Sequence, residues 1–322
     1  MKKLCLFLAL TFLFLSLASC SSGIEPVPQD TKSEVTTTKK KTEEKTEEKI
    51  LQEYDPAEDD EINVLMIGNS FCYYYVEELY NIAKTVGIKM KVCNVYYSGC
   101  SLKQHWTWWK LNESHYQYFE TDHQGRRKIA DPTNLKYCLS RENWDIISFQ
   151  QGNRSTKGDL QVARDSYYKY LTDLYELVTT QFPKTQIFWH QTWSYQVGYD
   201  KNGVKMVDAQ QQATEAKWQE EFSIMVCKDF NMIRVPSGSA WQYARQDSRV
   251  GDILCNRGEW SDNAHEGEEG GGQYLNACVW FEVITGQSCI GNTWRPDTYS
   301  LGEAMIAGLQ QAAHRAVSES RG

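Results

Sequence analysis

Short apolar runs that alternate with long amphipathic stretches are the feature that most restricts the fold of this chain. Each apolar run is short enough for a buried strand, and each stretch between them has the periodicity of a helix. Such alternation indicates a parallel sheet covered by helices on both faces. The predicted strands are residues 62–67, 88–95, 145–150, 186–190 and 232–235, and the predicted helices are residues 72–86, 162–180, 207–228, 271–285 and 300–317.

The first 19 residues have the parts of an export signal. Lys2 and Lys3 precede an apolar run over residues 4–15, and small residues follow it. The ending Leu-Ala-Ser-Cys at residues 17–20 resembles the lipobox of bacterial lipoproteins, which implies cleavage before Cys20 and lipid on its thiol. An ordinary signal peptide and an uncleaved anchor are the alternatives. The expected location is the cell envelope, with the protein lipid-anchored on the periplasmic or cell-surface side.

Residues 20–61 form the second predicted part, a disordered charged tether. Between residues 24 and 61 the chain carries 6 Lys and 13 acidic residues with very few apolar ones, so burial cannot offset the entropy of ordering. Residues 62–322 then form one domain. The formal net charge of the whole chain is −8, and this acidic balance makes nucleic acid an unlikely partner.

A serine and a histidine at opposite ends of the domain are the candidate catalytic pair. Ser70 directly follows the first predicted strand, where a strand-to-helix turn exposes a side chain. His265 follows Asp262 by three residues, a spacing at which the carboxylate can hold one ring nitrogen while the other acts as a base. Each segment alone also fits an ordinary polar loop.

Two further loops lie where ligands bind in parallel sheets, beyond the carboxyl ends of the strands. Gly99 follows the second predicted strand and can offer an unhindered backbone N–H to an oxyanion. Gln150, Gln151 and Asn153 follow the third, and their side-chain amides are candidate donors to the same oxyanion.

Taken together, Ser70, Gly99, the third-strand amide and the Asp262–His265 pair resemble the SGNH (GDSL-type) hydrolases, a family of esterases and acylhydrolases. Within them the chain looks closest to an exported bacterial group called domain of unknown function 4886. The resemblance implies a three-layer α/β/α sandwich with a central parallel five-stranded sheet of flavodoxin-like type. It implies Ser70 as nucleophile, His265 as base and Asp262 as its partner, with Ser70, Gly99 and Asn153 or Gln151 forming the oxyanion hole.

Two departures from the family pattern stand out. The usual Gly-Asp-Ser reads Gly68-Asn69-Ser70, and the usual Gly-x-Asn-Asp block reads Gly152-Asn153-Arg154. The first affects a position without a catalytic role in the pattern. The second leaves the amide donor open among Asn153, Gln151 and Gln150, with Asn153 favoured by the motif and Gln151 by its position at the strand end.

Aromatic residues make up 13% of the chain, and several follow the predicted strands. Flat rings beside a polar site can stack on sugars, so Trp106, Trp109, His190 and Trp193 are the candidate substrate-binding residues. The expected reaction is removal of acetyl or other acyl groups from carbohydrate, with no cofactor and no metal. The alternatives are a lipid or thioester acylhydrolase and a non-catalytic glycan-binding lipoprotein.

Overall fold

The computed structural model describes residues 61–152, 154–199, 205–256 and 264–321. The chain divides into two compact units, Met1–Ile50 and Leu51–Gly322, and all described residues belong to the second unit. The predicted signal, Cys20 and nearly all of the predicted tether lie outside the described residues.

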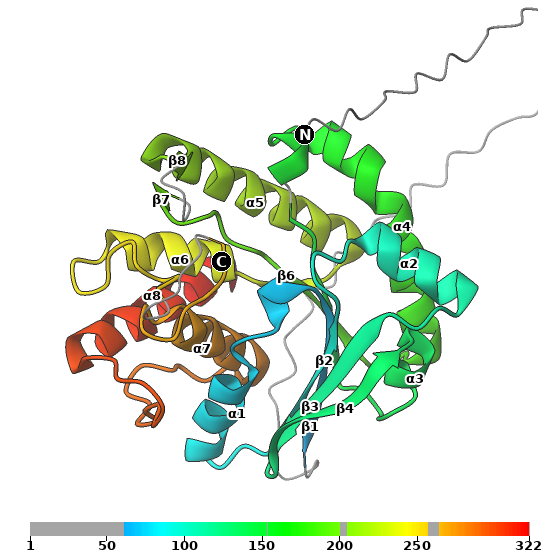
Figure 1. Ribbon diagram of the computed structural model, residues 1–322, viewed down its shortest axis with the longest axis horizontal. Helices are drawn as coiled ribbons and strands as arrows, with labels where there is room; N and C mark the ends of the chain where they lie inside the picture. The colour runs from blue at the N-terminus through cyan, green and yellow to red at the C-terminus, as the bar shows by residue number, and fades with distance from the viewer. Residues whose placement is uncertain (1–60, 153, 200–204, 257–263, 322) are drawn as a thin grey trace, which may run out of the picture. The chain divides into compact units, whose positions relative to one another are not determined.

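A seven-stranded sheet runs through the domain in the order β4-β3-β2-β1-β5-β6-β9 (Figure 1). The five neighbouring strands β2, β1, β5, β6 and β9 are parallel, which confirms the predicted five-stranded parallel sheet. The other two strands extend it in antiparallel fashion and were not predicted. The strands are β1 (Ile62–Gly68), β2 (Met90–Tyr96), β3 (Tyr116–Asp122), β4 (Gly125–Thr133), β5 (Ile146–Phe149), β6 (Gln186–His190) and β9 (Ile233–Val235); β7 (Gly198–Tyr199) and β8 (Lys205–Val207) form a separate small hairpin.

Helices cover both faces of the sheet and form two apolar cores, as the three-layer prediction requires. The first core joins the sheet to α1 (Val76–Thr85), α6 (Ser237–Gln246), α7 (Gly272–Thr285) and α8 (Glu303–Arg321). The second joins it to α2 (Leu102–Leu111), α3 (Leu135–Leu139), α4 (Leu160–Gln181) and α5 (Ala209–Phe230). Figure 1 shows α1, α7 and α8 on one side of the strands and α2, α3 and α4 on the other. The fold also has two 3-10 turns, η1 (Ser70–Cys72) and η2 (Arg154–Thr156).

The central strand β1 shows why the apolar runs predicted buried strands. Successive side chains of a strand point to opposite faces. Val64 and Met66 enter the first core, while Leu65 and Ile67 enter the second. A strand covered on both faces can therefore have apolar residues at successive positions, and from Val64 to Ile67 the pattern of β1 is continuous rather than alternating.

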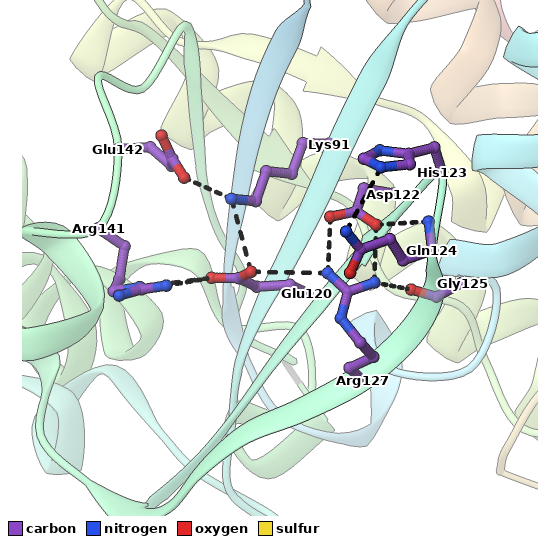
Figure 2. Close-up of polar contacts among 9 residues, drawn as sticks. All are labelled: Lys91, Glu120, Asp122, His123, Gln124, Gly125, Arg127, Arg141 and Glu142. Atoms are coloured by element: carbon purple, nitrogen blue, oxygen red, sulfur yellow. Dashed lines mark hydrogen bonds and ion pairs between the residues drawn. The ribbon is translucent and has the colours of Figure 1, made fainter.

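The antiparallel extension combines buried aromatic side chains of β3 with charge pairs. Glu120 of β3 is only 4% exposed, and its carboxylate lies 3.2 Å from Arg141 and 3.5 Å from Lys91 (Figure 2). Arg127 of β4 pairs with Asp122 at 2.7 Å. Charged side chains along an edge strand also discourage pairing with other chains. These polar positions gave no apolar run in the sequence.

The predicted helices are confirmed within a few residues, with one difference near the site. The helix expected over 72–86 begins at Val76, because η1 and a short turn come first. In the described part of the chain, no helix is both long and apolar enough to cross a membrane. The eight cysteines from Cys72 to Cys289 carry free thiols.

A buried carboxyl group on α1 gives the domain a pH-dependent stability. Burial raises the pKa of Glu78 to about 7, although the hydroxyl of Tyr299 donates to its Oε1 at 3.1 Å. The protonated form is favoured in the folded protein, so this contribution is fully present below pH 4.5 and is lost as pH rises through about 7.

In the parent protein we therefore expect the free energy of unfolding to fall by about 3 kcal/mol between pH 4.5 and 8 as Glu78 ionises. Glu78→Gln should not show this fall. Urea unfolding of both proteins across this range measures the difference. Glu77→Gln, at the exposed neighbouring position, is the control and should leave the pH dependence of the parent protein intact. Identical pH profiles for Glu78→Gln and the parent would contradict the account.

Candidate active site

The candidate site lies at the carboxyl edge of the parallel strands. In chain order the parallel strands are β1, β2, β5, β6 and β9, but in space β1 lies between β2 and β5. Ligands in such sheets bind where the strand order reverses, here between β1 and β5. Ser70 follows β1 and Gln150 follows β5, so both lie at this point.

The side chain of Asn69 ties three strand ends together beside Ser70. Its Nδ2 donates to the carbonyl of Cys100, beyond β2, at 3.0 Å. Its Oδ1 accepts from the backbone N–H of Phe71 at 3.1 Å and from Nε2 of Gln150, beyond β5. A carboxylate could not make the bond to the Cys100 carbonyl, which gives the asparagine in Gly68-Asn69-Ser70 a structural reason.

Close packing leaves no room for a side chain at the residue before Asn69. A Cβ on Gly68 would lie 2.9 Å from the Cys72 thiol and from the side chain of Gln150. The turn after β1 is therefore tightly packed. Ser70 begins η1 and is 7% exposed, so its side chain is buried, whereas the sequence predicted that the turn would expose it. The first N–H groups of a helix have no partner within it, so the Ser70 N–H is not used by η1.

His265 lies against the segment that carries Ser70. Its ring centroid is 6.3 Å from that of Phe71 and 5.7 Å from that of Tyr74. Trp193, whose ring packs on Phe71 at 4.7 Å, donates from Nε1 to the carbonyl of Ala264 at 2.9 Å and holds the backbone before His265. The structure therefore brings together two residues that are nearly 200 positions apart in the sequence.

The glycine-rich run after His265 is closely packed. A Cβ on Gly267 would lie 1.9 Å from the carbonyl oxygen of Asn256, and one on Gly270 would lie 1.8 Å from that of Ile253. Glu266, between the histidine and these glycines, is fully buried. The sequence suggested a polar loop here, but the glycines serve to fix the histidine segment against the turn at residues 253–256.

The predicted oxyanion donors differ in their hydrogen bonds and in the space around them. Gly99 has a φ of +66°, and nothing lies within 4 Å of a Cβ at this position, so its backbone is open. Gln150 donates from Nε2 to Oδ1 of Asn69, and Gln151 donates from Nε2 to the carbonyl of Gly152 at 3.2 Å. Each amide has two hydrogens, so both residues remain candidate donors. Gln151 also accepts from the N–H of Leu102 at 3.1 Å, so its amide is oriented by the start of α2.

Two predicted residues lie outside the described residues. These are Asp262, the expected partner of His265, and Asn153, the alternative to Gln151 as amide donor. Both roles remain predictions. Among the described ranges no group of His, Cys, Asp and Glu side chains is arranged to hold a metal ion.

The structure corrects two of the four predicted substrate contacts. His190 and Trp193 are each 1% exposed, so their side chains support the site from within the core and offer no surface to a ligand. His190 pairs through Nε2 with the Ser237 hydroxyl at 3.0 Å, and burial lowers its pKa to about 3, which keeps the ring neutral. Trp106 and Trp109 are half-buried on α2 and pack against the second core.

The sequence reading missed the tyrosines that follow Ser70. The Tyr73 ring lies 5.0 Å from that of Tyr74, which contacts His265. Tyr73 also packs on Tyr96 at the end of β2, with ring centroids 4.3 Å apart. Three consecutive tyrosines, which begin three residues after the candidate nucleophile, were a visible signal for an aromatic wall, although the third of them lies in the core.

These features define an α/β protein with a serine–histidine pair at the switch point of a parallel sheet. The chain belongs to the DUF4886 family, whose model, described as a domain of unknown function, matches residues 63–316. A crystal structure of a DUF4886 family protein from Bacteroides uniformis has a TM-score of 0.68 and 28% sequence identity, and the match covers 80% of this chain and 95% of that one.

More distant structures also match. The periplasmic domain of a lipopolysaccharide acetyltransferase from Salmonella Paratyphi A has a TM-score of 0.44 at 12% identity, over 70% of this chain and 84% of that one. A lipase/acylhydrolase from Enterococcus faecalis has a TM-score of 0.42 at 11% identity, over 70% and 96%. The comparison with curated proteins gave no match.

The hydrogen bonds of Asn69 beside Ser70 predict that an aspartate at position 69, as in the GDSL-type pattern, lowers the stability of this protein. Asn69→Asp should lower the free energy of unfolding by about 1–3 kcal/mol, because the carbonyl of Cys100 loses its donor and faces a carboxylate oxygen. Urea unfolding measures the change.

Asn134→Asp is the matched control. Asn134 caps α3 by accepting from the N–H of Tyr137 at 2.8 Å, and an aspartate keeps that bond. Its stability should be nearly unchanged. Equal effects at the two positions would show that Asn69 does not depend on its donor.

Proposed function

We propose that this protein is a serine esterase in which Ser70 is the nucleophile, His265 the general base and Asp262 the carboxylate that orients the histidine. The observation that carries the proposal is the packing of His265 on Phe71, which follows Ser70 in η1, and on Tyr74 just beyond it. A hydroxyl nucleophile needs a general base, and an imidazole at the same strand edge can take this role.

The reaction follows from these roles. His265 takes the proton from Ser70 as its Oγ attacks the ester carbonyl. The N–H groups of Ser70 and Gly99 and the amide of Gln151 or Asn153 hold the oxyanion. The alcohol leaves with the proton from His265, and a water molecule activated by the same ring then releases the acid from Ser70.

The proposed substrate is an O-acylated carbohydrate. Support comes from an aromatic group beside the Gly99 turn. Tyr97 is 38% exposed, and its ring lies 4.9 Å from that of Trp108, which in turn lies 4.3 Å from His115. Partly exposed rings of this kind can pack on the apolar face of a sugar. This group takes the place of the buried His190 and Trp193 as the candidate sugar platform.

The proposed setting is the outer side of a bacterial membrane. The signal over residues 1–19, the lipid on Cys20 and the charged tether up to residue 61 support this from the sequence. A tether of about 40 residues behaving as a coil would span on the order of 35 Å. That reach would let an anchored enzyme act on glycans above the membrane.

The first test is hydrolysis of p-nitrophenyl acetate. Ser70→Ala should lower kcat at least about 10³-fold, because the nucleophile is lost. Ser98→Ala removes an exposed hydroxyl from the neighbouring turn and should leave the rate unchanged. Turnover that survives Ser70→Ala would remove Ser70 from its role, and glycan binding without any turnover would favour a non-catalytic binding protein.

The second test identifies the amide donor. Gln151→Glu keeps the acceptor for the Leu102 N–H but removes the amide donor. Asn153→Asp removes the amide donor at position 153. The variant that loses the oxyanion donor should have a kcat lower by about 10²–10³ with little change in KM, and the other should stay near the parent rate. Two parent-like variants would show that neither amide holds the oxyanion.

A further inference from the structure

One arginine beside the candidate site has a buried charge without a partner. Arg126 lies on β4, and its Nε and Nη2 atoms are buried and have no hydrogen-bond partner among the described residues. Burying a charged donor without an acceptor costs free energy, and such groups are retained where they have a task.

Strand geometry explains why Arg126 differs from its neighbour. Arg127 lies opposite Glu120 in the β3–β4 pairing, and it joins the ion network of Figure 2. Arg126 lies opposite Thr121. Because successive side chains point to opposite faces, Arg126 faces away from those carboxylates.

On its own face, Arg126 lies over aromatic rings. Its guanidinium carbon is 4.0 Å from the ring centroid of Tyr73 and 5.0 Å from that of Phe119. These contacts stabilise the cation without neutralising it. They also fix the plane of the guanidinium group, so that Nη1, the nitrogen that is not buried, is the donor open to an anion.

The Tyr73 contact connects Arg126 to the candidate active site. Tyr73 ends η1, its N–H donating to the carbonyl of Ser70 at 3.3 Å. From Tyr73 the rings continue through Tyr74 to His265, and neither step between centroids exceeds 5.7 Å. The charge of Arg126 also reaches η1, since it opposes the rise that burial causes in the pKa of Cys72.

We propose that Arg126 binds the carboxylate of an acidic sugar, so that the substrate is an O-acylated carbohydrate with a uronic acid residue next to the acylated one. This inference rests on the proposed esterase function and narrows its substrate class. A hydrogen bond from a guanidinium group to a carboxylate is charge-assisted, and such a bond is about twice as strong as a neutral one. The Tyr73–Tyr74 wall would then lie along the sugar between Arg126 and Ser70.

Binding of sugars that contain no ester tests Arg126 independently of catalysis. Isothermal titration calorimetry with methyl glucuronoside and methyl glucoside should give a Kd at least about tenfold lower for the acidic sugar. Arg126→Gln should abolish this preference, and Arg126→Lys should keep part of it because the charge remains. Lys128→Gln removes the same charge two residues along β4, where the lysine pairs with Asp131, and should keep the preference.

A second measurement covers the case in which Arg126→Gln does not fold. In the parent protein the preference for methyl glucuronoside should shrink as NaCl rises from about 0.05 to 0.5 M, because salt screens the attraction. Equal binding of the two sugars by the parent protein, a preference retained in Arg126→Gln, or a preference unaffected by salt would overturn the proposal.

Turnover separates this proposal from the esterase itself. Acetate release from an O-acetylated methyl glucuronoside should exceed release from its methyl ester, and Arg126→Gln should equalise the two. If the parent protein hydrolyses none of these esters, the proposed esterase function is contradicted. If it releases acetate equally from both sugars, only the role of Arg126 is contradicted.

Discussion

The hydrogen bonds of one side chain, Asn69, hold the candidate site together. Asn69 joins the turn after β1 to the loops after β2 and β5, which are the loops that carry Gly99 and Gln151. A parallel sheet brings these three loops to one edge, but only such a cross-link sets their mutual positions to the accuracy that acyl transfer needs. The tight turn at Gly68 and the packing of Phe71 on Trp193 complete this frame, and His265 rests on it.

How much the sequence could predict depends on which force specifies each element. The strands of the parallel sheet are buried on both faces, so an apolar run such as residues 62–67 reveals them directly. Strand β3 combines buried tyrosines with polar residues, and charge pairs such as Arg127–Asp122 join it to β4. Their polar residues resemble a loop when read one after another, because pairing between charges is a property of the folded register. The helix α2 was missed although Ser101 and Gln104 form a capping box at its start.

Some residues of the candidate site could likewise be predicted from the sequence, and others could not. Ser70 and His265 could be found from their order and from the chemistry of their side chains. Burial could not be read from the residue type, so Trp193 and His190 were placed at the surface when they lie in the core. Arg126 could not be found at all, since its significance depends on the face of β4 that it occupies and on the Tyr73 ring beneath it. Residues that act through a partner distant in the sequence become visible only when the fold supplies that partner.

The central claim is that the fold makes one serine hydroxyl reactive by placing His265 beside it. Labelling with a fluorophosphonate, followed by mass spectrometry of the digested protein, tests this most directly, because only an activated serine attacks the phosphorus atom. The account predicts a single adduct on Ser70 that disappears in His265→Ala, with the fold unchanged by circular dichroism. An unlabelled protein, an adduct on a different serine, or labelling of Ser70 that does not depend on His265 would contradict it.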